Sequence, residues 1–204
     1  MIGIRVSGVR SLRRGSRDVL VPELSVDGPG IVLVRGANGA GKSTFIELLA
    51  GGLRPHAGSV SVCGAPAASS DARRARRVSR ADIALLPLVT IRRHAALFAR
   101  AAGVDASAAI ASLVDEGLGT RIDERVAALS TGEARRAWVR LTTLGAAPVL
   151  LLDEPFLGLD APAAAALQTR LDRWGRDRLV LLVDHGERQL STVVREVRLG
   201  EGCA

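Results

Sequence analysis

The stretch that decides the fold is Gly36-Ala37-Asn38-Gly39-Ala40-Gly41-Lys42-Ser43-Thr44. It fits the pattern G-x-x-x-x-G-K-[ST], in which glycines let backbone N–H groups turn toward a polyanion without steric obstruction. Lys42 is the only lysine among the 28 lysine and arginine residues of the chain, so a compact ammonium on a flexible stem is used at this position alone. The stretch therefore predicts a phosphate-binding loop in which Lys42 reaches the outer phosphates and Ser43 ligates Mg²⁺.

The residues on either side of this loop support that interpretation. The apolar run 30–35 predicts a short buried strand, and residues 42–49 predict a helix whose N-terminus faces the phosphates. The alternative is a chance match in a glycine-rich turn. Strand, loop and helix follow one another in the order that the phosphate chemistry requires, which argues against that alternative.

Length and composition bound the number of domains and the compartment. With 204 residues the chain can build one substantial core, so we expect a single nucleotide-binding domain over 1–204, with a core of about 1–88 and 145–204 and a helical subdomain of about 89–144. The mean hydropathy is +0.22, yet no stretch approaches the ~18 uninterrupted apolar residues of a spanning helix. Residues 1–6 show strand-like alternation rather than a charged and then apolar leader, so we expect a cytosolic protein.

The formal net charge of +7 raises the question of an anionic partner. The composition argues against nucleic acid as that partner, because the chain has only two tryptophans, three phenylalanines and no tyrosine with which to stack bases. A solvated basic face, or attraction to anionic lipid, explains the arginines better. The arginines in question form one run at 73–77 and a second cluster at Arg10, Arg13, Arg14 and Arg17. Cys63 and Cys203 have no metal-type spacing and do not indicate a disulfide framework.

A second acidic segment complements the phosphate loop. Residues 149–152 are a continuous apolar run that leads into Asp153 and Glu154, as expected of a central parallel strand that delivers acids to its carboxyl edge. Asp153 is suited to the magnesium shell, and Glu154 to accepting a proton from an attacking water. Two acids at a strand end could instead cap the following turn. Downstream of a phosphate loop, the catalytic interpretation is favoured.

The segment Leu129-Ser130-Thr131-Gly132-Glu133 forms a capping box, with serine at the N-cap and glutamate three residues later. Taken alone, it indicates only the start of a helix. With the other motifs it resembles the signature of the ATP-binding cassette family, usually written L-S-G-G-Q. The resemblance extends over nearly the whole chain, and includes the turn 157–160 and His185 after the apolar strand 178–183.

This resemblance implies an α/β fold of the P-loop NTPase type, with a mainly parallel, doubly wound core sheet, an antiparallel N-terminal β part and an inserted α-helical subdomain. The alternation of strands and helices along the chain predicts the same core. The family likeness further implies that two cassettes stack head to tail around ATP. The signature residues Ser130, Thr131, Gly132 and Glu133 of one copy would then act on the nucleotide held by the other.

Individual roles follow from the same resemblance. ATP and Mg²⁺ are the implied cofactors, with Lys42, Glu154 and His185 as catalytic residues and Asp160 as the link between the two sites. The metal ligands would be Ser43 and Asp153. The implied ATP-binding residues are Gly36, Ala37, Asn38, Gly39, Ala40, Gly41, Lys42, Ser43 and Thr44.

Two departures from the family pattern qualify the expected activity. Leu88 stands where the family places a glutamine that touches magnesium, and an apolar side chain cannot coordinate a hard cation. The segment 10–18 has no aromatic residue to stack on adenine, so we expect Arg13 or Arg14 to cover the base. We therefore expect Mg-ATP binding and dimerisation, with slow hydrolysis in the absence of a partner.

The function that we expect is that of the ATP-binding and hydrolysing subunit of an ABC transporter. A separate transmembrane permease subunit would be its partner, the cassettes would form a homodimer or heterodimer, and the chain would be cytoplasmic and peripheral on the inner face of the cell membrane. One alternative is a regulatory ABC-type ATPase with weak hydrolysis. Another is a soluble cassette acting on DNA or ribosomes, although such proteins usually carry paired cassettes or long coiled insertions.

The remaining elements follow from periodicity and capping residues. We expect a strand over 59–62, helices near 92–102, 107–116 and 133–144, a helix that starts at 160–162, and a final strand over 194–199. Asp71 is the expected N-cap of the arginine-rich helix that follows it. His56 and His94 are interpreted as surface or hydrogen-bonded residues without a catalytic role.

Overall fold

The phosphate-loop segment lies between strand β4 (Gly30–Arg35) and helix α1 (Lys42–Leu49), with the bounds predicted from the sequence. The computed structural model describes residues 1–12, 18–186 and 189–200. Its residues cluster into two compact units: Met1–Val78, Ala147–Glu154 and Gln168–Ala204 make the first, and Ser79–Ala146 with Pro155–Leu167 make the second. The domain boundaries expected from the sequence, about 88 and 145, remain predictions.

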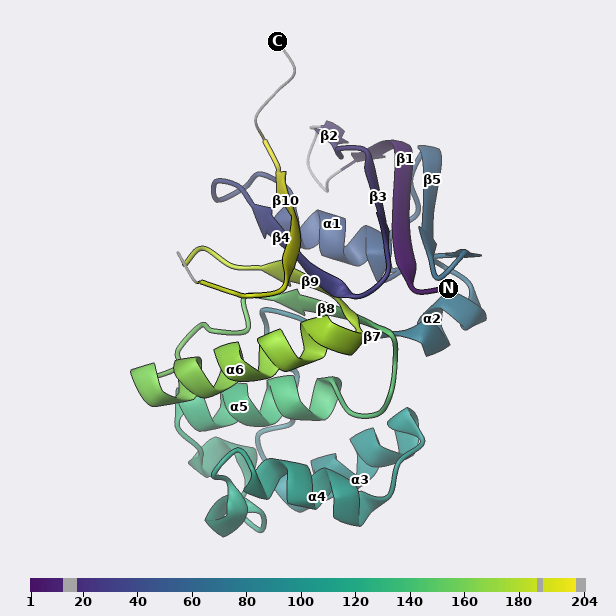
Figure 1. Ribbon diagram of the computed structural model, residues 1–204. Helices are drawn as coiled ribbons and strands as arrows, with labels where there is room; N and C mark the ends of the chain where they lie inside the picture. Colours follow the sequence, from purple (N-terminus) through teal and green to yellow (C-terminus); the bar gives the residue numbers. More distant parts are fainter. Residues whose placement is uncertain (13–17, 187–188, 201–204) are drawn as a thin grey trace. The chain divides into compact units, whose positions relative to one another are not determined.

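A five-stranded sheet carries the phosphate loop (Figure 1). Its strand order is β10-β4-β9-β8-β7, and β10, β4, β9 and β8 run parallel to one another. All residues of β8 and β9 are buried, which explains why these segments read as continuous apolar runs. Besides β4, the sheet contains β7 (Arg76–Ser79), β8 (Val149–Asp153), β9 (Leu179–Val183) and β10 (Val193–Arg198).

The register of this sheet brings three functional segments to one edge. Val183 of β9 is level with Val34 of β4 on one side and with Asp153 of β8 on the other. The residues that follow these three strand ends are therefore neighbours, although they are far apart in sequence. This is the edge at which doubly wound α/β proteins bind ligands.

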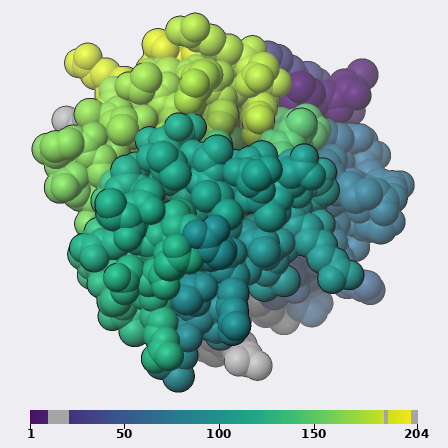
Figure 2. All heavy atoms as spheres, turned by 90° about the horizontal axis from the view of Figure 1, so that it is seen from below, coloured from purple at the N-terminus to yellow at the C-terminus, as the bar shows by residue number. Residues whose placement is uncertain are grey.

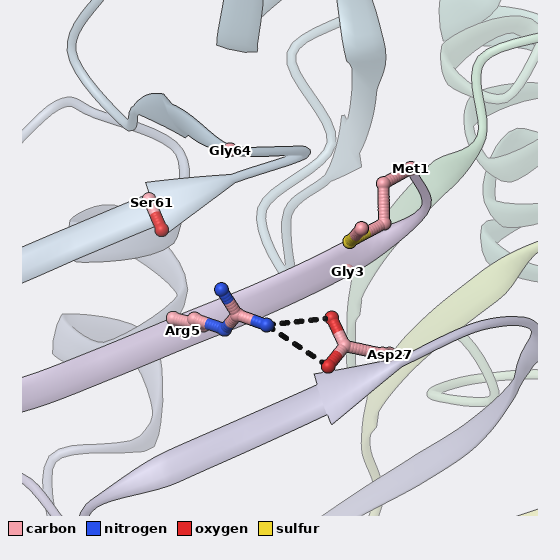
Figure 3. Close-up of a pocket in the computed structure, with 6 residues that line it drawn as sticks. All are labelled: Met1, Gly3, Arg5, Asp27, Ser61 and Gly64. Atoms are coloured by element: carbon pink, nitrogen blue, oxygen red, sulfur yellow. Dashed lines mark hydrogen bonds and ion pairs between the residues drawn. The ribbon is translucent and has the colours of Figure 1, made fainter.

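The first unit also contains an antiparallel sheet around β1 (Gly3–Leu12). This strand pairs with β2 (Asp18–Leu20), β3 (Leu24–Asp27) and β5 (Ala57–Val62), and β5 pairs with β6 (Ala65–Pro66). On its outer face, Arg5 donates to both carboxylate oxygens of Asp27 at 3.0 and 3.3 Å (Figure 3). Buried residues on the other face, such as Ile4 and Val6, share one hydrophobic core with α1 and the parallel sheet.

The second unit is helical. It contains α3 (Ile91–Ala102), α4 (Ala106–Val114), α5 (Thr131–Thr142) and the 3₁₀ turns η1 (Gly119–Arg121) and η2 (Val126–Ala128). Trp138 anchors its core: the indole packs edge-on against Phe98 at a centroid distance of 6.0 Å, and its Nε1 donates to the Arg80 carbonyl at 2.8 Å. Figure 2 shows the outer surface of these helices in teal and green. The helix α6 (Ala161–Asp177) begins in this unit and ends in the first.

Two local predictions around α2 (Ser70–Ala75) are wrong. Ser69, rather than Asp71, is the N-cap, because its Oγ accepts the Ala72 N–H at 3.2 Å, while Asp71 lies in the first turn and pairs with Arg74 at 2.5 Å. Arg76 does not belong to a solvated basic face. It is only 5% exposed and donates to the carbonyls of Ala67 and Ala50, so it joins segments of the core.

Candidate functional site

The phosphate-loop conformation requires glycine at particular positions. Gly41 has a φ of 97° and is the N-cap of α1, without any side-chain cap bond to the first helical amides. Gly39 has a φ of 86°, and a Cβ on Gly36 would lie 2.6 Å from the Leu199 carbonyl oxygen. Uncapped amides at a helix N-terminus, reached through a glycine loop, form an anion-binding site.

Lys42 is held against this loop. Its side chain is buried at 8% exposure, and its Nζ donates to the carbonyl oxygens of Gly36 at 2.9 Å and Ala37 at 3.0 Å. Backbone carbonyl oxygens thus hold the ammonium over the loop. A polyanion bound in the loop would meet this positive charge directly.

A recess of about 300 Å³ brings together residues from the three strand ends. Its walls are the phosphate loop, the end of β8 and His185, which lies two residues beyond the end of β9. The lining residues are Asn38, Gly39, Gly41, Lys42, Ser43, Thr44, Asp153, Glu154 and His185. The sequence-predicted Gly36, Ala37 and Ala40 line an adjoining cavity of about 480 Å³.

Ser43 and Asp153 supply oxygen donors in this recess. Asp153 is 4% exposed and Ser43 is exposed. Among the residues that the structure describes, no three His, Cys, Asp or Glu side chains are arranged as a metal site. Mg²⁺ is commonly held by one or two protein oxygens together with waters and substrate phosphates, so this donor set fits Mg²⁺ bound with a polyphosphate.

Glu154 is a carboxylate with an unusual environment. Its φ is +51°, and its backbone N–H donates to the Val183 carbonyl at 3.0 Å, which fixes the turn after β8. Its Oε1 lies 2.8 Å from Nε2 of His185. Burial raises the pKa of Glu154, as do the nearby Asp153 and Asp184 charges, while His185 opposes the rise. A carboxylate with a raised pKa beside a phosphate loop has the character of a general base.

Arg35, which the sequence analysis did not single out, lies beside this site. Its guanidinium donates to the Gly186 carbonyl at 3.0 Å and lies 3.7 Å from the Glu196 carboxylate on β10. Gly186 directly follows His185, so Arg35 restrains the turn that carries the histidine. The only sequence signal was its position, the last residue of the strand before Gly36.

The signature segment begins α5 in the second unit. Ser130 Oγ accepts the Glu133 N–H at 3.2 Å and the Glu133 carboxylate accepts the Ser130 N–H at 2.8 Å, so the predicted capping box is confirmed. Gly132 lies against the turn at Gly158, whose carbonyl oxygen would be 3.1 Å from a Cβ at position 132. Ser130 and Thr131 remain exposed at the helix N-terminus, where they are accessible to an anion.

Asp160 belongs to the same unit and caps α6, because its Oδ1 accepts the Ala163 N–H at 2.9 Å. Leu88 is 75% exposed in the turn before α3. His94 is 3% exposed, and its Nε2 accepts the Leu86 N–H at 3.0 Å, which confirms its interpretation as a hydrogen-bonded structural histidine. Arg13 and Arg14, expected to cover the base, lie outside the described residues.

None of the helices within the described residues is both long enough and apolar enough to cross a lipid bilayer.

The sequence model of the ABC transporter family matches residues 23–157 of this chain. A Nod factor export ATP-binding protein I of Burkholderia pseudomallei (strain 1710b) is 38% identical over 159 residues, which cover 74% of this chain and 52% of that protein. The chain therefore spans about half the length of such curated relatives.

Two further similar proteins are matched over a larger share of their own length. A cytochrome c biogenesis ATP-binding export protein CcmA of Hyphomonas neptunium is 40% identical over 161 residues, or 78% of this chain and 74% of that protein. A solved structure of the ATP binding subunit of an ABC transporter superimposes with a TM-score of 0.77 at 26% identity, covering 91% of this chain and 80% of that one. The likeness thus includes both the sequence motifs and the α/β fold.

Proposed function

Because this chain belongs to the ABC transporter family, we propose that it is an ATP-binding and hydrolysing subunit that couples ATP-driven closure of two cassettes to transport by a separate membrane subunit. The observation that carries the proposal is the recess in which Lys42, Asp153, Glu154 and His185 meet around the phosphate loop. The protein would act at the cytoplasmic face of a membrane as a peripheral subunit.

The residues of the recess have different roles in the proposed hydrolysis. The loop amides and the Lys42 ammonium would hold the phosphates, and Ser43 and Asp153 would hold Mg²⁺, which would supply charge neutralisation when bound. Glu154 accepts a proton from the water that attacks the γ-phosphate, and its raised pKa suits that task. His185 orients Glu154 through the 2.8 Å contact and faces the same recess as the phosphates.

The residues that line the recess include none from the N-terminus of α5, and the exposed Ser130 and Thr131 at this helix end support the second half of the proposal. Ser130, Thr131 and Gly132 offer a hydroxyl-rich helix end that favours an anion. In a head-to-tail pair they would close over the triphosphate held by the other copy, so that ATP joins the copies and its hydrolysis releases them. Asp160 would lie at the same interface.

The alternative is a regulatory cassette with weak hydrolysis, which the exposed Leu88 in place of a glutamine favours. Both proposals are tested by measuring the binding of a fluorescent ATP analogue and the release of phosphate with Mg²⁺. Lys42→Ala should abolish binding, whereas Glu154→Gln should bind but not hydrolyse. Equal binding by wild type and Lys42→Ala would show that the recess is not the nucleotide site. Binding by the wild type without measurable phosphate release would favour the regulatory cassette.

A further inference from the structure

Glu133 carries a negative charge at the start of α5, the helix end that the proposed dimer presents to phosphate. Its Oε2 accepts the Ser130 N–H at 2.8 Å and its Oε1 accepts Nε–H of Arg121 at 2.9 Å. The Glu133 side chain is 18% exposed. The bond from the Ser130 backbone, followed by that from Arg121, lowers the pKa of Glu133, so the carboxylate is ionised near neutral pH.

An ionised carboxylate at this position opposes the proposed role of the helix end. The N-terminus of a helix is equivalent to roughly half a positive charge, and a carboxylate in the first turn cancels that charge and repels a second anion. A glutamine at position 133 would accept the Ser130 N–H through its amide oxygen without adding charge. A glutamine could thus make the same capping bond, so that bond alone does not explain why the residue at position 133 is charged and pairs with an arginine.

Arg121 supplies the compensating charge from a rigid turn. Leu118, three residues before it, and Ile122, the residue after it, are 0% and 5% exposed and belong to the core of the helical unit. The Arg121 N–H donates to the Leu118 carbonyl at 2.9 Å, and the Arg121 carbonyl accepts the Glu124 N–H at 3.0 Å. The backbone of η1 is thus held on both sides of Arg121, and from this turn the guanidinium donates to the Glu133 carboxylate.

We propose that Arg121 is a positioning residue of the signature segment. It neutralises Glu133 and fixes its carboxylate in the capping box, so that the N-terminus of α5 keeps the positive field with which it receives the triphosphate bound to a second copy. This inference rests on the proposed head-to-tail dimer.

The test measures the ATP concentration that gives half-maximal dimerisation by light scattering, with every variant built on Glu154→Gln to prevent hydrolysis. Arg121→Ala should raise that concentration roughly 3- to 10-fold at low ionic strength and less at high ionic strength, since it leaves one unpaired charge near the phosphates. Added to Glu133→Gln, the same change should have no further effect, because no carboxylate remains to be neutralised. Arg121→Lys should stay near the parent protein.

Arg5→Ala is the matched control, because it removes an arginine from another exposed ion pair, with Asp27 on the antiparallel sheet (Figure 3). It should leave the ATP dependence unchanged. The inference is overturned if Arg121→Ala has no effect, if its effect is equally large on Glu133→Gln, or if Arg121→Lys behaves like Arg121→Ala. If the Glu154→Gln parent itself does not dimerise with ATP, the proposed function fails, and the inference fails with it.

Discussion

Nε2 of His185 lies 2.8 Å from Oε1 of Glu154, so the histidine after β9 directly contacts the acid after β8. The contact depends on the sheet register that makes Val183 level with Asp153. It couples the orientation and charge of the proposed base to those of a neighbouring side chain.

Turnover should depend on pH through Glu154. Because burial raises its pKa above the ordinary glutamate value of about 4.3, the base becomes protonated, and phosphate release falls, at a higher pH than for an exposed carboxylate. His185 counteracts this rise, so His185→Ala should move the acidic limb of the profile to still higher pH and lower the maximum. An acidic limb at the same pH in both proteins would contradict the coupling.

The same raised pKa has a consequence for stability. A carboxylate whose pKa is higher in the folded than in the unfolded state destabilises the fold above the folded pKa, and this cost disappears as the pH falls through it. Glu154→Gln should therefore raise the thermal midpoint at neutral pH, with a gain that shrinks in acid. Scanning calorimetry at several pH values measures this, and Glu124→Gln, at an exposed glutamate of the helical unit, provides the control.

Arg35 should act on hydrolysis through His185. Arg35→Ala frees the Gly186 carbonyl, so kcat should fall while the KM for ATP changes little, and Arg35→Lys should restore part of the loss. In a His185→Ala background, Arg35→Ala should cause no further decrease, because the residue that it positions is gone. Additive losses in the double variant would assign Arg35 a role of its own.

Trp138 should dominate the stability of the helical unit. Trp138→Ala removes a side chain that is 6% exposed and should cost about 3–5 kcal/mol in the free energy of unfolding. Trp138→Phe keeps a ring beside Phe98 but loses the bond to the Arg80 carbonyl, and should cost about 1–3 kcal/mol. Urea denaturation measures the free energy of unfolding of both variants. Equal losses in Trp138→Ala and Trp138→Phe would show that packing of the ring contributes little.

The first half of the site could be predicted because its signals are local. The strand 30–35, the glycine loop and the helix 42–49 follow one another without interruption, and each has a distinct pattern of residues. The apolar strands β8 and β9 were equally clear, and in a parallel sheet their carboxyl ends necessarily share an edge. The nearness of Glu154 and His185 follows from that topology.

Other features could not be predicted, because they depend on partners distant in sequence. Arg76 lies in a basic run, and only the fold reveals that it donates to carbonyls of two buried segments. Arg35 and Arg121 likewise acquire a role through a carbonyl or carboxylate that neither composition nor periodicity connects with them. At Ser69 and Asp71, both residue types favour an N-cap, and the structure uses the earlier one.

The head-to-tail sandwich is tested most directly by the mass of Glu154→Gln in solution, determined by light scattering with saturating ATP and Mg²⁺. The variant should have twice the 21.3 kDa of one chain with ATP and return to that mass with ADP. Ser130→Ala combined with Thr131→Asp, which places a carboxylate at the exposed, phosphate-facing helix end, should prevent the doubling. A Glu154→Gln protein that binds ATP yet keeps the mass of one chain would contradict the account.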